Sequence, residues 1–375
     1  NHKQKRLIFT TDLNEAVKNS DIIFICVGTP TKKNSNSADL KHVFNVANKL
    51  KKIIKKYKII ITKSTVPVTT GDKIEKILSK LKNKNLVDIV SNPEFLREGE
   101  AIRDFIFPDR VIIGTDSKKA NNILKSLYLP IIKKTNRYFN TSRRGAELIK
   151  YASNAFLATK ITFINELANL SEKTAVDIKD ISLGMGSDQR IGDRFLRAGP
   201  AYGGSCFPKD TRALINIGEK FKTDLSIVKS VVNSNNKRKI LLTKKVETIL
   251  KGNLKGKIVS FLGVTFKPNT DDMREASSIP MINFLNKKKC KIKYFDPSGE
   301  KKEFKKLKYV KYCKNISSTC LKADLVIIHT EWNEFKFLNF KKLVKKDNFK
   351  IYDMRNIYSP TKMKKLKIQY YGIGR

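Results

Sequence analysis

Short, almost wholly apolar runs alternate with helix-like stretches through the first part of the chain. A strand that is buried on both faces has such a continuous apolar pattern, which is typical of a parallel sheet covered by helices. We expect strands at residues 7–10, 21–27, 58–62, 87–91 and 110–114, and helices at residues 11–17, 39–56 and 71–81. Polar and glycine-containing motifs follow several of these strands, at the end where doubly wound sheets bind ligands. The pattern therefore predicts a doubly wound α/β domain.

A long helical region separates this domain from a second alternation of strands and helices. Residues 141 to about 170 have a helical pattern without a strong break, and a further helical region runs to about residue 248, interrupted by glycine-containing loops at 184–210. After a boundary at residues 252–256, we expect strands at 257–263, 291–296, 324–328 and 349–353, and a helix at 277–287. The sequence predicts an α/β fold with two Rossmann-like, doubly wound parallel-sheet domains, joined by a central helical region with a long helix. The expected domains are residues 1–140, 141–250 and 251–375.

The large net positive charge does not by itself indicate a nucleic-acid or membrane partner. The chain has 375 residues, 40% of them hydrophobic, and a formal net charge of +42. Such an excess could attract nucleic acid or an anionic membrane. Because the lysines run through the whole chain and no nucleic-acid-binding motif accompanies them, we interpret them as solvated surface charge that helps gather phosphate-bearing ligands. No run of about 18 apolar residues occurs, so we expect no segment that spans a membrane. We expect neither a membrane nor nucleic acid as a partner.

The cysteines are odd in number and scattered, at Cys26, Cys206, Cys290, Cys313 and Cys320. This usage argues for a reducing compartment, hence the cytoplasm, and against a disulfide framework. No Cys-x-x-Cys pair occurs, and the three histidines are far apart in sequence. We therefore expect no metal site.

The most informative motif is GGSCFPKD, at residues 203–210. Its two glycines let backbone or a ligand come close just before the sulfur of Cys206, and Pro208 suits the first turn of a helix. A thiol at a helix start beside a lysine is biased toward the thiolate, which is the nucleophilic form. The motif alone leaves a second interpretation open, in which Cys206 is a small buried hydrophobe.

Six motifs in a fixed order lead to a resemblance that covers nearly the whole chain. They are VGTPT at 27–31, STVPV at 64–68, NPEFLREG at 92–99, KYASN at 150–154, GGSCFPKD at 203–210, and GVTFKP at 263–268 with Arg274 and Glu275. With them the chain resembles the UDP-glucose 6-dehydrogenase family, within the wider UDP-glucose/GDP-mannose dehydrogenases. The resemblance implies oxidation of UDP-glucose at C6 by two NAD⁺, with UDP-glucuronate released for polysaccharide synthesis. It also implies that residues 1–140 bind NAD, that 141–250 mediate a homodimer, and that 251–375 bind the UDP-sugar.

The resemblance also implies how the second oxidation proceeds. Cys206 would add to the aldehyde as a thiohemiacetal, and loss of a second hydride would leave a thioester that water cleaves. Lys150 and Asn154 are spaced i, i+4 on one helical face and would stabilise the developing oxyanion. Asp210 would assist proton transfer, and Glu94 would assist thioester hydrolysis.

The remaining implied contacts concern the cofactor and the substrate. The cofactor contacts are Thr29, Thr65, Glu98, Lys209 and Arg274, with the Thr65 hydroxyl also near the reacting centre. The substrate contacts are Glu94, Phe95, Leu96, Arg97, Glu98, Lys150, Asn154, Arg190, Phe195, Leu196, Arg197, Ala198, Gly199, Gly203 and Lys267. Without the resemblance, the basic residues are surface charge, and Glu94, Glu98 and Asp210 are carboxylates in first helical turns, where the helix dipole favours them.

One expected motif is absent. No Gly-x-Gly-x-x-Gly pattern occurs among the 18 glycines, so we expect the chain to start partway through its first domain, without the first β-α unit. Alternatives to the proposed oxidation are a dehydrogenase of a UDP-N-acetylaminosugar or of GDP-mannose, and a truncated, non-catalytic module that binds UDP-sugar and dimerises. A nucleic-acid binder is suggested by the charge alone.

Overall fold

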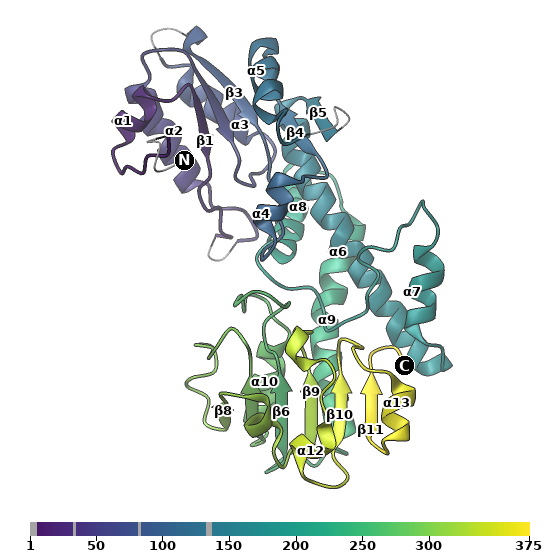
Figure 1. Ribbon diagram of the computed structural model, residues 1–375. Coiled ribbons are helices and arrows are strands. Elements are labelled where there is room, and N and C mark those ends of the chain that lie inside the picture. Colours follow the sequence, from purple (N-terminus) through teal and green to yellow (C-terminus); the bar gives the residue numbers. More distant parts are fainter. Residues whose placement is uncertain (1–5, 33–34, 82–83, 133–136) are drawn as a thin grey trace. The chain divides into compact units, whose positions relative to one another are not determined.

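The computed structural model describes residues 6–32, 35–81, 84–132 and 137–375. The chain divides into two compact units. Unit 1 comprises Asn1–Ser153 and Arg212–Asp224, and unit 2 comprises Asn154–Thr211 and Leu225–Arg375. Each unit is built on its own sheet, the first in purple and blue and the second in green and yellow (Figure 1).

Unit 1 contains a five-stranded sheet in the order β1-β2-β3-β4-β5. Its strands are β1 (Ile22–Ile25), β2 (Lys58–Thr62), β3 (Val87–Ser91), β4 (Val111–Gly114) and β5 (Tyr138–Thr141). The strands pair in parallel, except that β3 and β4 are antiparallel. The helical elements of unit 1 are α1 (Leu13–Lys18), α2 (Lys41–Ile53), α3 (Thr70–Leu78), η1 (Lys84–Leu86), α4 (Ala101–Ile106) and α5 (Lys118–Tyr128).

Strand β2, which lies between β1 and β3, shows why this sheet is covered on both faces. All five of its residues are buried. Ile60 packs into a core with Val43 and Leu50 of α2, whereas Ile59 and Ile61 pack into a second core with Leu124 of α5. Since successive side chains of a strand point to opposite faces, the continuous apolar run fills two cores at once.

Two expectations about unit 1 are wrong. Residues 7–10 form no strand, and Ile8 and Phe9 are 71% and 80% exposed, because no described strand lies beside them to pair with their backbone. Glu94 and Glu98 do not lie in a first helical turn, because the helix of this region begins only at Ala101. The helix-dipole explanation of these two carboxylates therefore falls away.

Unit 2 contains a six-stranded, wholly parallel sheet in the order β11-β10-β9-β6-β7-β8. Its strands are β6 (Ile258–Leu262), β7 (Lys291–Phe295), β8 (Val310–Tyr312), β9 (Leu325–Ile328), β10 (Lys350–Asp353) and β11 (Gln369–Gly372). The shorter helical elements of this unit are α7 (Ile178–Gly186), α10 (Ser278–Lys287), α11 (Ile316–Cys320), η3 (Asn333–Phe335), α12 (Phe340–Val344) and α13 (Pro360–Lys365). This strand order is that of dinucleotide-binding folds, and the direction of winding reverses between β6 and β9. Ligands of such sheets bind outside the carboxyl ends of the strands at this reversal.

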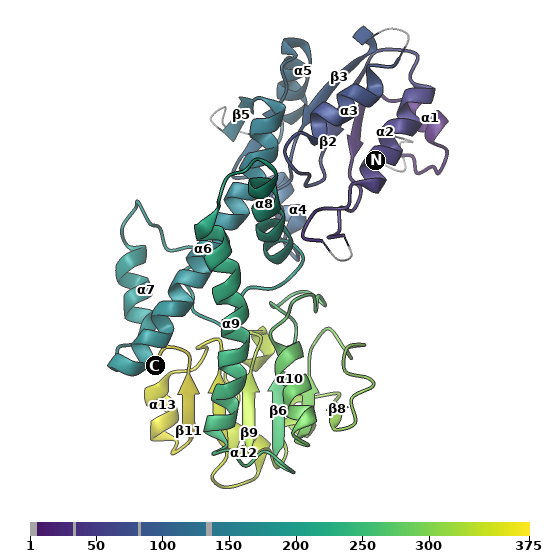
Figure 2. The same ribbon diagram turned by 180° about the vertical axis from the view of Figure 1, so that it is seen from behind.

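Three long helices complete the fold. Helix α6 (Arg143–Thr174) has 32 residues and belongs to unit 1 at its start and to unit 2 at its end. Helix α8 (Phe207–Lys220) starts directly after Cys206, and α9 (Ser226–Ile249) packs against α10 in unit 2; both are seen from behind in Figure 2. Two α/β domains joined by a long helix confirm the predicted fold class.

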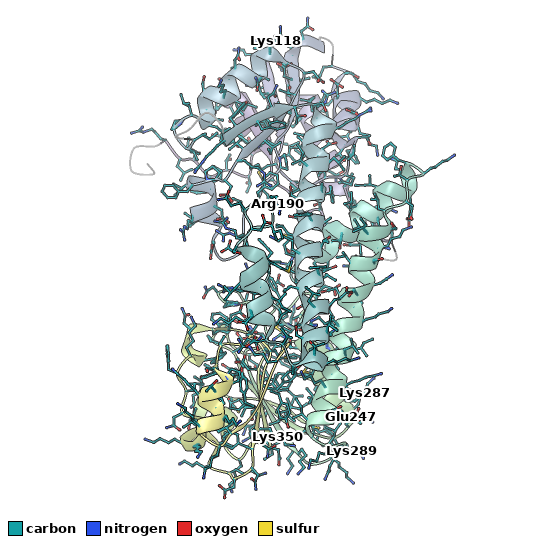
Figure 3. All side chains as sticks on the ribbon, turned by 90° about the vertical axis from the view of Figure 1, so that its right-hand side faces the viewer. Lys118, Arg190, Glu247, Lys287, Lys289 and Lys350 are labelled. Carbon is teal, nitrogen blue, oxygen red and sulfur yellow. The ribbon has the colours of Figure 1, made fainter. Side chains whose placement is uncertain are left out.

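Charged side chains cover both units. Lys118 projects from unit 1, and Lys287, Lys289 and Lys350 lie on unit 2 (Figure 3). This distribution agrees with charge spread over the surface rather than gathered in one arm. Among the described residues, no helix combines the length and the apolar character needed to cross a bilayer.

Candidate active site

A buried lysine in unit 1 contacts two residues of the loop after β3, Glu94 and Phe95. Lys150, in α6, is 3% exposed. Its Nζ donates to the main-chain oxygen of Glu94 at 2.6 Å and to Glu94 Oε1 at 3.2 Å, and it lies 5.2 Å from the ring centroid of Phe95. An ammonium group held in this way is a fixed cation, able to stabilise negative charge that develops on a neighbouring oxygen.

The loop that carries Glu94 is held at its start by hydrogen bonds to Asn92, the first residue after β3. Asn92 is 1% exposed and accepts hydrogen bonds at Oδ1 from Lys63 Nζ at 3.0 Å and from the Tyr128 hydroxyl at 2.5 Å. Glu94 Oε2 accepts from the main-chain N–H of Leu96 at 2.6 Å. Burial lowers the pKa of Lys63 to about 8, because it removes water from the ammonium group. The Lys63 amine therefore changes its charge close to neutral pH.

The loops after β1 and β2 meet at the carboxyl edge of the unit 1 sheet. Thr29 Oγ1 donates to the main-chain oxygen of Thr65 at 2.9 Å, and both threonines are 9% exposed. Ser64 Oγ donates to the main-chain oxygen of Val27 at 2.7 Å. No described atom lies within 4 Å of a Cβ built on Gly28, so there is room for a ligand to lie against this backbone. This edge fits a dinucleotide, with Thr29 and Thr65 as the candidate contacts.

Glu147 is a functional candidate that sequence reasoning missed. It stands one helical turn before Lys150, is 3% exposed, and accepts from the main-chain N–H groups of Thr69 at 2.8 Å and Gly71 at 2.7 Å and from Ser91 Oγ at 3.2 Å. It thereby fixes the start of α3 and the end of β3 to α6. The only local signal was its position on the same helical face as Lys150.

We expect the Glu147 carboxyl to make unit 1 more stable in mild acid. Burial raises its pKa from 4.5 to about 7, so the folded form binds the proton more tightly than the unfolded form does. This contribution is complete below pH 4.5, is lost as the pH rises through 7, and amounts to at most about 3 kcal/mol. Unfolding of the wild type and of Glu147→Gln, measured from pH 4.5 to 8, should show a steeper decline in the wild type. Parallel profiles would contradict the assignment.

In unit 2, the structure brings together three of the predicted catalytic residues: Cys206, Asp210 and Asn154. Cys206 is half-buried directly before α8, and its main-chain oxygen accepts from the Asp210 N–H at 2.8 Å. The Asp210 carboxylate is 1% exposed and accepts from Asn154 Nδ2 at 2.6 Å and from Lys209 Nζ at 2.7 Å. The thiol thus lies at a helix N-terminus, one turn from a carboxylate that Asn154 and Lys209 orient.

The glycine pair before Cys206 is required by close packing. Gly204 has φ +77°, and a Cβ built there would lie 2.6 Å from the Phe266 ring. A Cβ on Gly203 would lie 2.8 Å from the main-chain oxygen of Glu275, and the Gly204 N–H donates to the main-chain oxygen of Arg274 at 2.8 Å. The cysteine loop therefore lies directly against the segments that carry Phe266 and Arg274.

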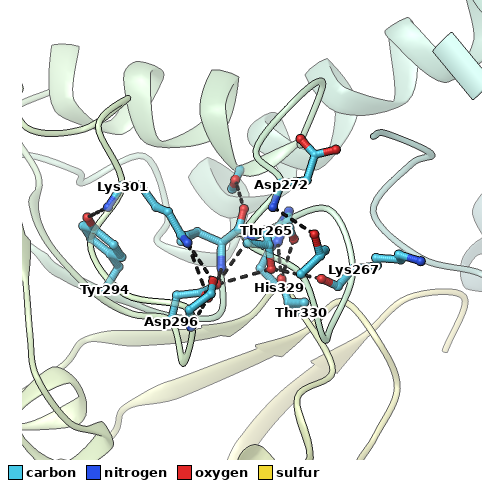
Figure 4. Close-up of polar contacts among 12 residues, drawn as sticks. Thr265, Lys267, Asp272, Tyr294, Asp296, Lys301, His329 and Thr330 are labelled. Carbon is cyan, nitrogen blue, oxygen red and sulfur yellow. Dashed lines mark hydrogen bonds and ion pairs between the residues drawn. The ribbon is translucent and has the colours of Figure 1, made fainter. Parts of the chain in front are cut away.

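The loop after β6, which carries Lys267, is held by a buried carboxylate (Figure 4). Asp296 is fully buried and accepts at Oδ2 from the main-chain N–H groups of Val264 at 2.8 Å and Thr265 at 3.3 Å. The Lys301 ammonium lies 3.8 Å from its other oxygen, and Thr330 Oγ1 donates to the Thr265 main-chain oxygen at 2.6 Å. The loop at the reversal of the sheet is therefore rigid, and the Asp296 carboxylate is used internally.

The predicted arginines differ in their surroundings. Arg97, Arg190 and Arg274 each form a paired contact with an aspartate a few residues away, namely Asp104, Asp188 and Asp272. Arg197 is exposed, and within the described parts of the chain its guanidinium has no hydrogen bond or ion pair. In the same loop, Leu196, Ala198 and Gly199 are buried and Phe195 is half-buried with φ +67°. Arg197 is thus the loop cation best placed to receive a phosphate.

Comparisons with known proteins identify the family. Residues 1–132, 144–237 and 260–360 match, in that order, the NAD binding domain, the central domain and the UDP binding domain of the UDP-glucose/GDP-mannose dehydrogenase family. The chain belongs to this family. Two proteins similar to this dehydrogenase are UDP-glucose 6-dehydrogenases. That of Rickettsia felis is 44% identical over 98% of this chain and 82% of the relative. That of Rhizobium meliloti is 42% identical over 99% of this chain and 85% of the relative.

A solved structure agrees with this membership. A UDP-glucose dehydrogenase from Pyrobaculum islandicum superimposes with a TM-score of 0.88 at 33% identity, covering 100% of this chain and 84% of that one. The family resemblance expected from the six motifs is confirmed, and so is NAD as the cofactor of this dehydrogenase family. The roles of individual site residues remain predictions.

Proposed function

We propose that this dehydrogenase oxidises UDP-glucose to UDP-glucuronate with two molecules of NAD⁺. The observation that carries the proposal is Cys206 at the start of α8, with the buried Asp210 carboxylate one turn away and bound by Asn154. A nucleophile is needed only if the aldehyde is oxidised further, to the acid. The relatives named UDP-glucose 6-dehydrogenase support the choice of substrate.

The proposed reaction uses the chain's own side chains as follows. After the first oxidation, the Cys206 thiolate forms a C–S bond with the aldehyde carbon, and the resulting oxyanion is stabilised by Lys150 and Asn154. NAD⁺ would supply the hydride acceptor in each of the two oxidations, and loss of the second hydride from the carbon bound to Cys206 leaves a thioester. Water then cleaves the thioester with Asp210 and Glu94 assisting proton transfer, which releases the carboxylate and regenerates the thiol.

We assign the binding roles by the same reasoning. Thr29, Thr65, Glu98, Lys209 and Arg274 are proposed to contact NAD. The nucleotide sugar is proposed to contact residues 94–98, Lys150, Asn154, Arg190, residues 195–199, Gly203 and Lys267, with the unpaired Arg197 facing a phosphate. The division into an NAD-binding part (1–140), a central part (141–250) and a UDP-sugar-binding part (251–375) belongs to the same proposal.

The decisive experiment measures the stoichiometry of reduction. Protein expressed from the complete gene, given limiting UDP-glucose and excess NAD⁺, should form two NADH per sugar, with UDP-glucuronate as the product. One NADH per sugar, with an aldehyde product, would reject the four-electron reaction. Faster oxidation of GDP-mannose or of a UDP-N-acetylaminosugar would transfer the proposal to that substrate, and a protein that binds UDP-glucose without reducing NAD⁺ would be the non-catalytic module.

We further propose a cytoplasmic homodimer formed through the central helices of unit 2. Phe156, Phe163 and Leu170 are 66%, 48% and 55% exposed and lie two helical turns apart along α6, so they form one apolar stripe. A second copy would remove this stripe from water. Light scattering should give the mass of a dimer for the wild type and of a monomer for Phe163→Glu. A monomeric wild type would reject the proposal.

A further inference from the structure

The loop that carries the largest group of the proposed substrate contacts has no helix or strand of its own. Between α7 and α8, residues 187–206 are irregular. Phe195 and Ala201 have φ angles of +67° and +130°, which side-chain-bearing residues rarely adopt. Such backbone persists only where its surroundings determine it. The question is therefore which contacts hold the shape of this loop.

Two buried side chains bind both main-chain polar groups of Gly199. Asn165 Oδ1, from α6, accepts from the Gly199 N–H at 2.8 Å, and Arg238 Nε, from α9, donates to the Gly199 oxygen at 2.8 Å. Arg238 Nη1 also donates to the main-chain oxygen of Asn165 at 2.8 Å, which joins the two helices. The two residues are 2% and 4% exposed, and although burial lowers the pKa of Arg238 to about 10, it stays charged at neutral pH.

A third side chain repeats the arrangement three residues further along the loop. Asn235 Oδ1, from α9, accepts from the Tyr202 N–H at 2.9 Å, and Asn235 Nδ2 donates to the Tyr202 oxygen at 3.1 Å. Asn235 is 3% exposed. The Tyr202 ring packs edge-on against Phe207, the first residue of α8. The second fixed point therefore leads directly to Cys206.

We propose that Asn165, Asn235 and Arg238 are positioning residues that set the shape of the nucleotide-sugar loop from the two long helices of unit 2. This inference rests on the proposed function, because the loop is taken to bind the sugar nucleotide. The four main-chain groups are buried with these side chains, and a buried polar group that loses its partner is costly. Loss of one side chain therefore frees the loop to leave the shape in which Arg197, Gly203 and Cys206 are presented.

The amide of Asn165 offers a matched pair of variants. Its Nδ2 is buried and has no hydrogen-bond partner among the described residues, so only its oxygen acts on the loop. Asn165→Asp keeps that acceptor and gains the Arg238 guanidinium as a neighbouring countercharge, whereas Asn165→Leu has a similar size and no acceptor. The two variants separate the hydrogen bond to Gly199 from the volume of the side chain.

Two measurements test the proposal on protein from the complete gene. The rate of hydrogen exchange at the Gly199 and Tyr202 amides shows, without any substrate, whether these hydrogen bonds hold the loop. Steady-state kinetics show how the shape of the loop affects the KM for UDP-glucose. We expect Asn165→Leu to speed exchange at Gly199 and to raise the KM for UDP-glucose by about tenfold or more, with the KM for NAD⁺ changed less than about twofold. Asn165→Asp should stay near the wild type in both measurements.

The control is Asn169→Ala, one turn further along α6. Asn169 Oδ1 accepts from Arg238 Nη1 at 3.1 Å but does not touch the loop. We expect both measurements to stay at wild-type values in this variant. An equal effect of Asn169→Ala, or unchanged exchange and KM in Asn165→Leu, would overturn the proposal.

The remaining outcomes are also decisive. If Asn165→Leu does not fold, Arg238→Lys replaces it, because an ammonium lacks the planar, fixed pair of donors with which the guanidinium binds the Gly199 and Asn165 oxygens. The same exchange and KM changes are then required. If the wild type does not oxidise UDP-glucose, the proposed function fails. Amide exchange in the variants still tests whether these side chains hold the loop.

Discussion

Replacement of Cys206 by alanine should lower the oxidation of UDP-glucose to UDP-glucuronate by about 10³-fold or more, because no other group can form the covalent link to the aldehyde carbon. The sulfur stands directly before α8, one turn from the buried Asp210 carboxylate. The first oxidation does not need the sulfur. The variant should therefore still transfer one hydride, although with slow release of the aldehyde. Rapid-mixing measurement of NADH, with analysis of the product, checks both parts.

The control for this prediction is Cys313→Ala. Cys313 is a free thiol in unit 2 that is 6% exposed and lies outside the proposed site. Its removal should leave turnover unchanged, and a thiol reagent should inactivate this variant as it does the wild type, with UDP-glucose protecting both. Normal turnover in Cys206→Ala would end the covalent proposal.

Replacement of Lys150 by methionine should lower kcat by about 10²- to 10³-fold, the effect typical of removing one group that stabilises an oxyanion. Methionine fills a similar volume, so the packing against Phe95 is kept while the charge is lost. Glu94 then loses the Lys150 hydrogen bonds to Oε1 and to its main-chain oxygen, but keeps the Leu96 N–H at Oε2. We expect the KM for UDP-glucose to change much less than kcat, because the charge on oxygen develops only during the reaction.

Lys173→Met is the matched control. This residue lies in the last turn of the same helix and is exposed. The substitution should leave kcat and KM unchanged. A Lys150→Met enzyme with normal kcat and a raised KM would show that the ammonium binds the substrate in its ground state and does not stabilise the transition state.

The fold was predictable where a single local pattern dominated. The run that became β2 is apolar at three consecutive positions, 59–61, and needs no knowledge of its neighbours to be identified as a strand buried on both faces. Short strands with polar residues, such as β5 and β8, gave no such signal and were missed. Residues 7–10 gave the signal without a described strand to pair with, since pairing depends on residues far away in sequence.

In the candidate site, too, residues with a local sequence signal were predicted, and residues whose partners are distant in sequence were not. Motifs of a few residues brought Cys206, Asp210 and Lys150 to notice, because their spacing to a helix start or along a helix is local. Residues that hold these motifs in place were not predicted, since their partners are distant in sequence: Asn165 binds Gly199, and Asp296 binds Val264. An asparagine on a helix or an aspartate after a strand carries no local mark of what it will bind.

One turn of α6 has a mechanical consequence for unit 1. Glu147 accepts hydrogen bonds from the main-chain N–H groups of Thr69 and Gly71, at the start of α3. Lys150, on the next turn of α6, donates to Glu94 in the loop after β3. If one loop shifted alone, the buried Glu147 carboxyl or the buried Lys150 ammonium would lose its hydrogen bonds to that loop. The loss of such partners by a buried ionisable group is costly. The two loops and this part of the helix are therefore coupled, so that a displacement of one of them requires a displacement of the others.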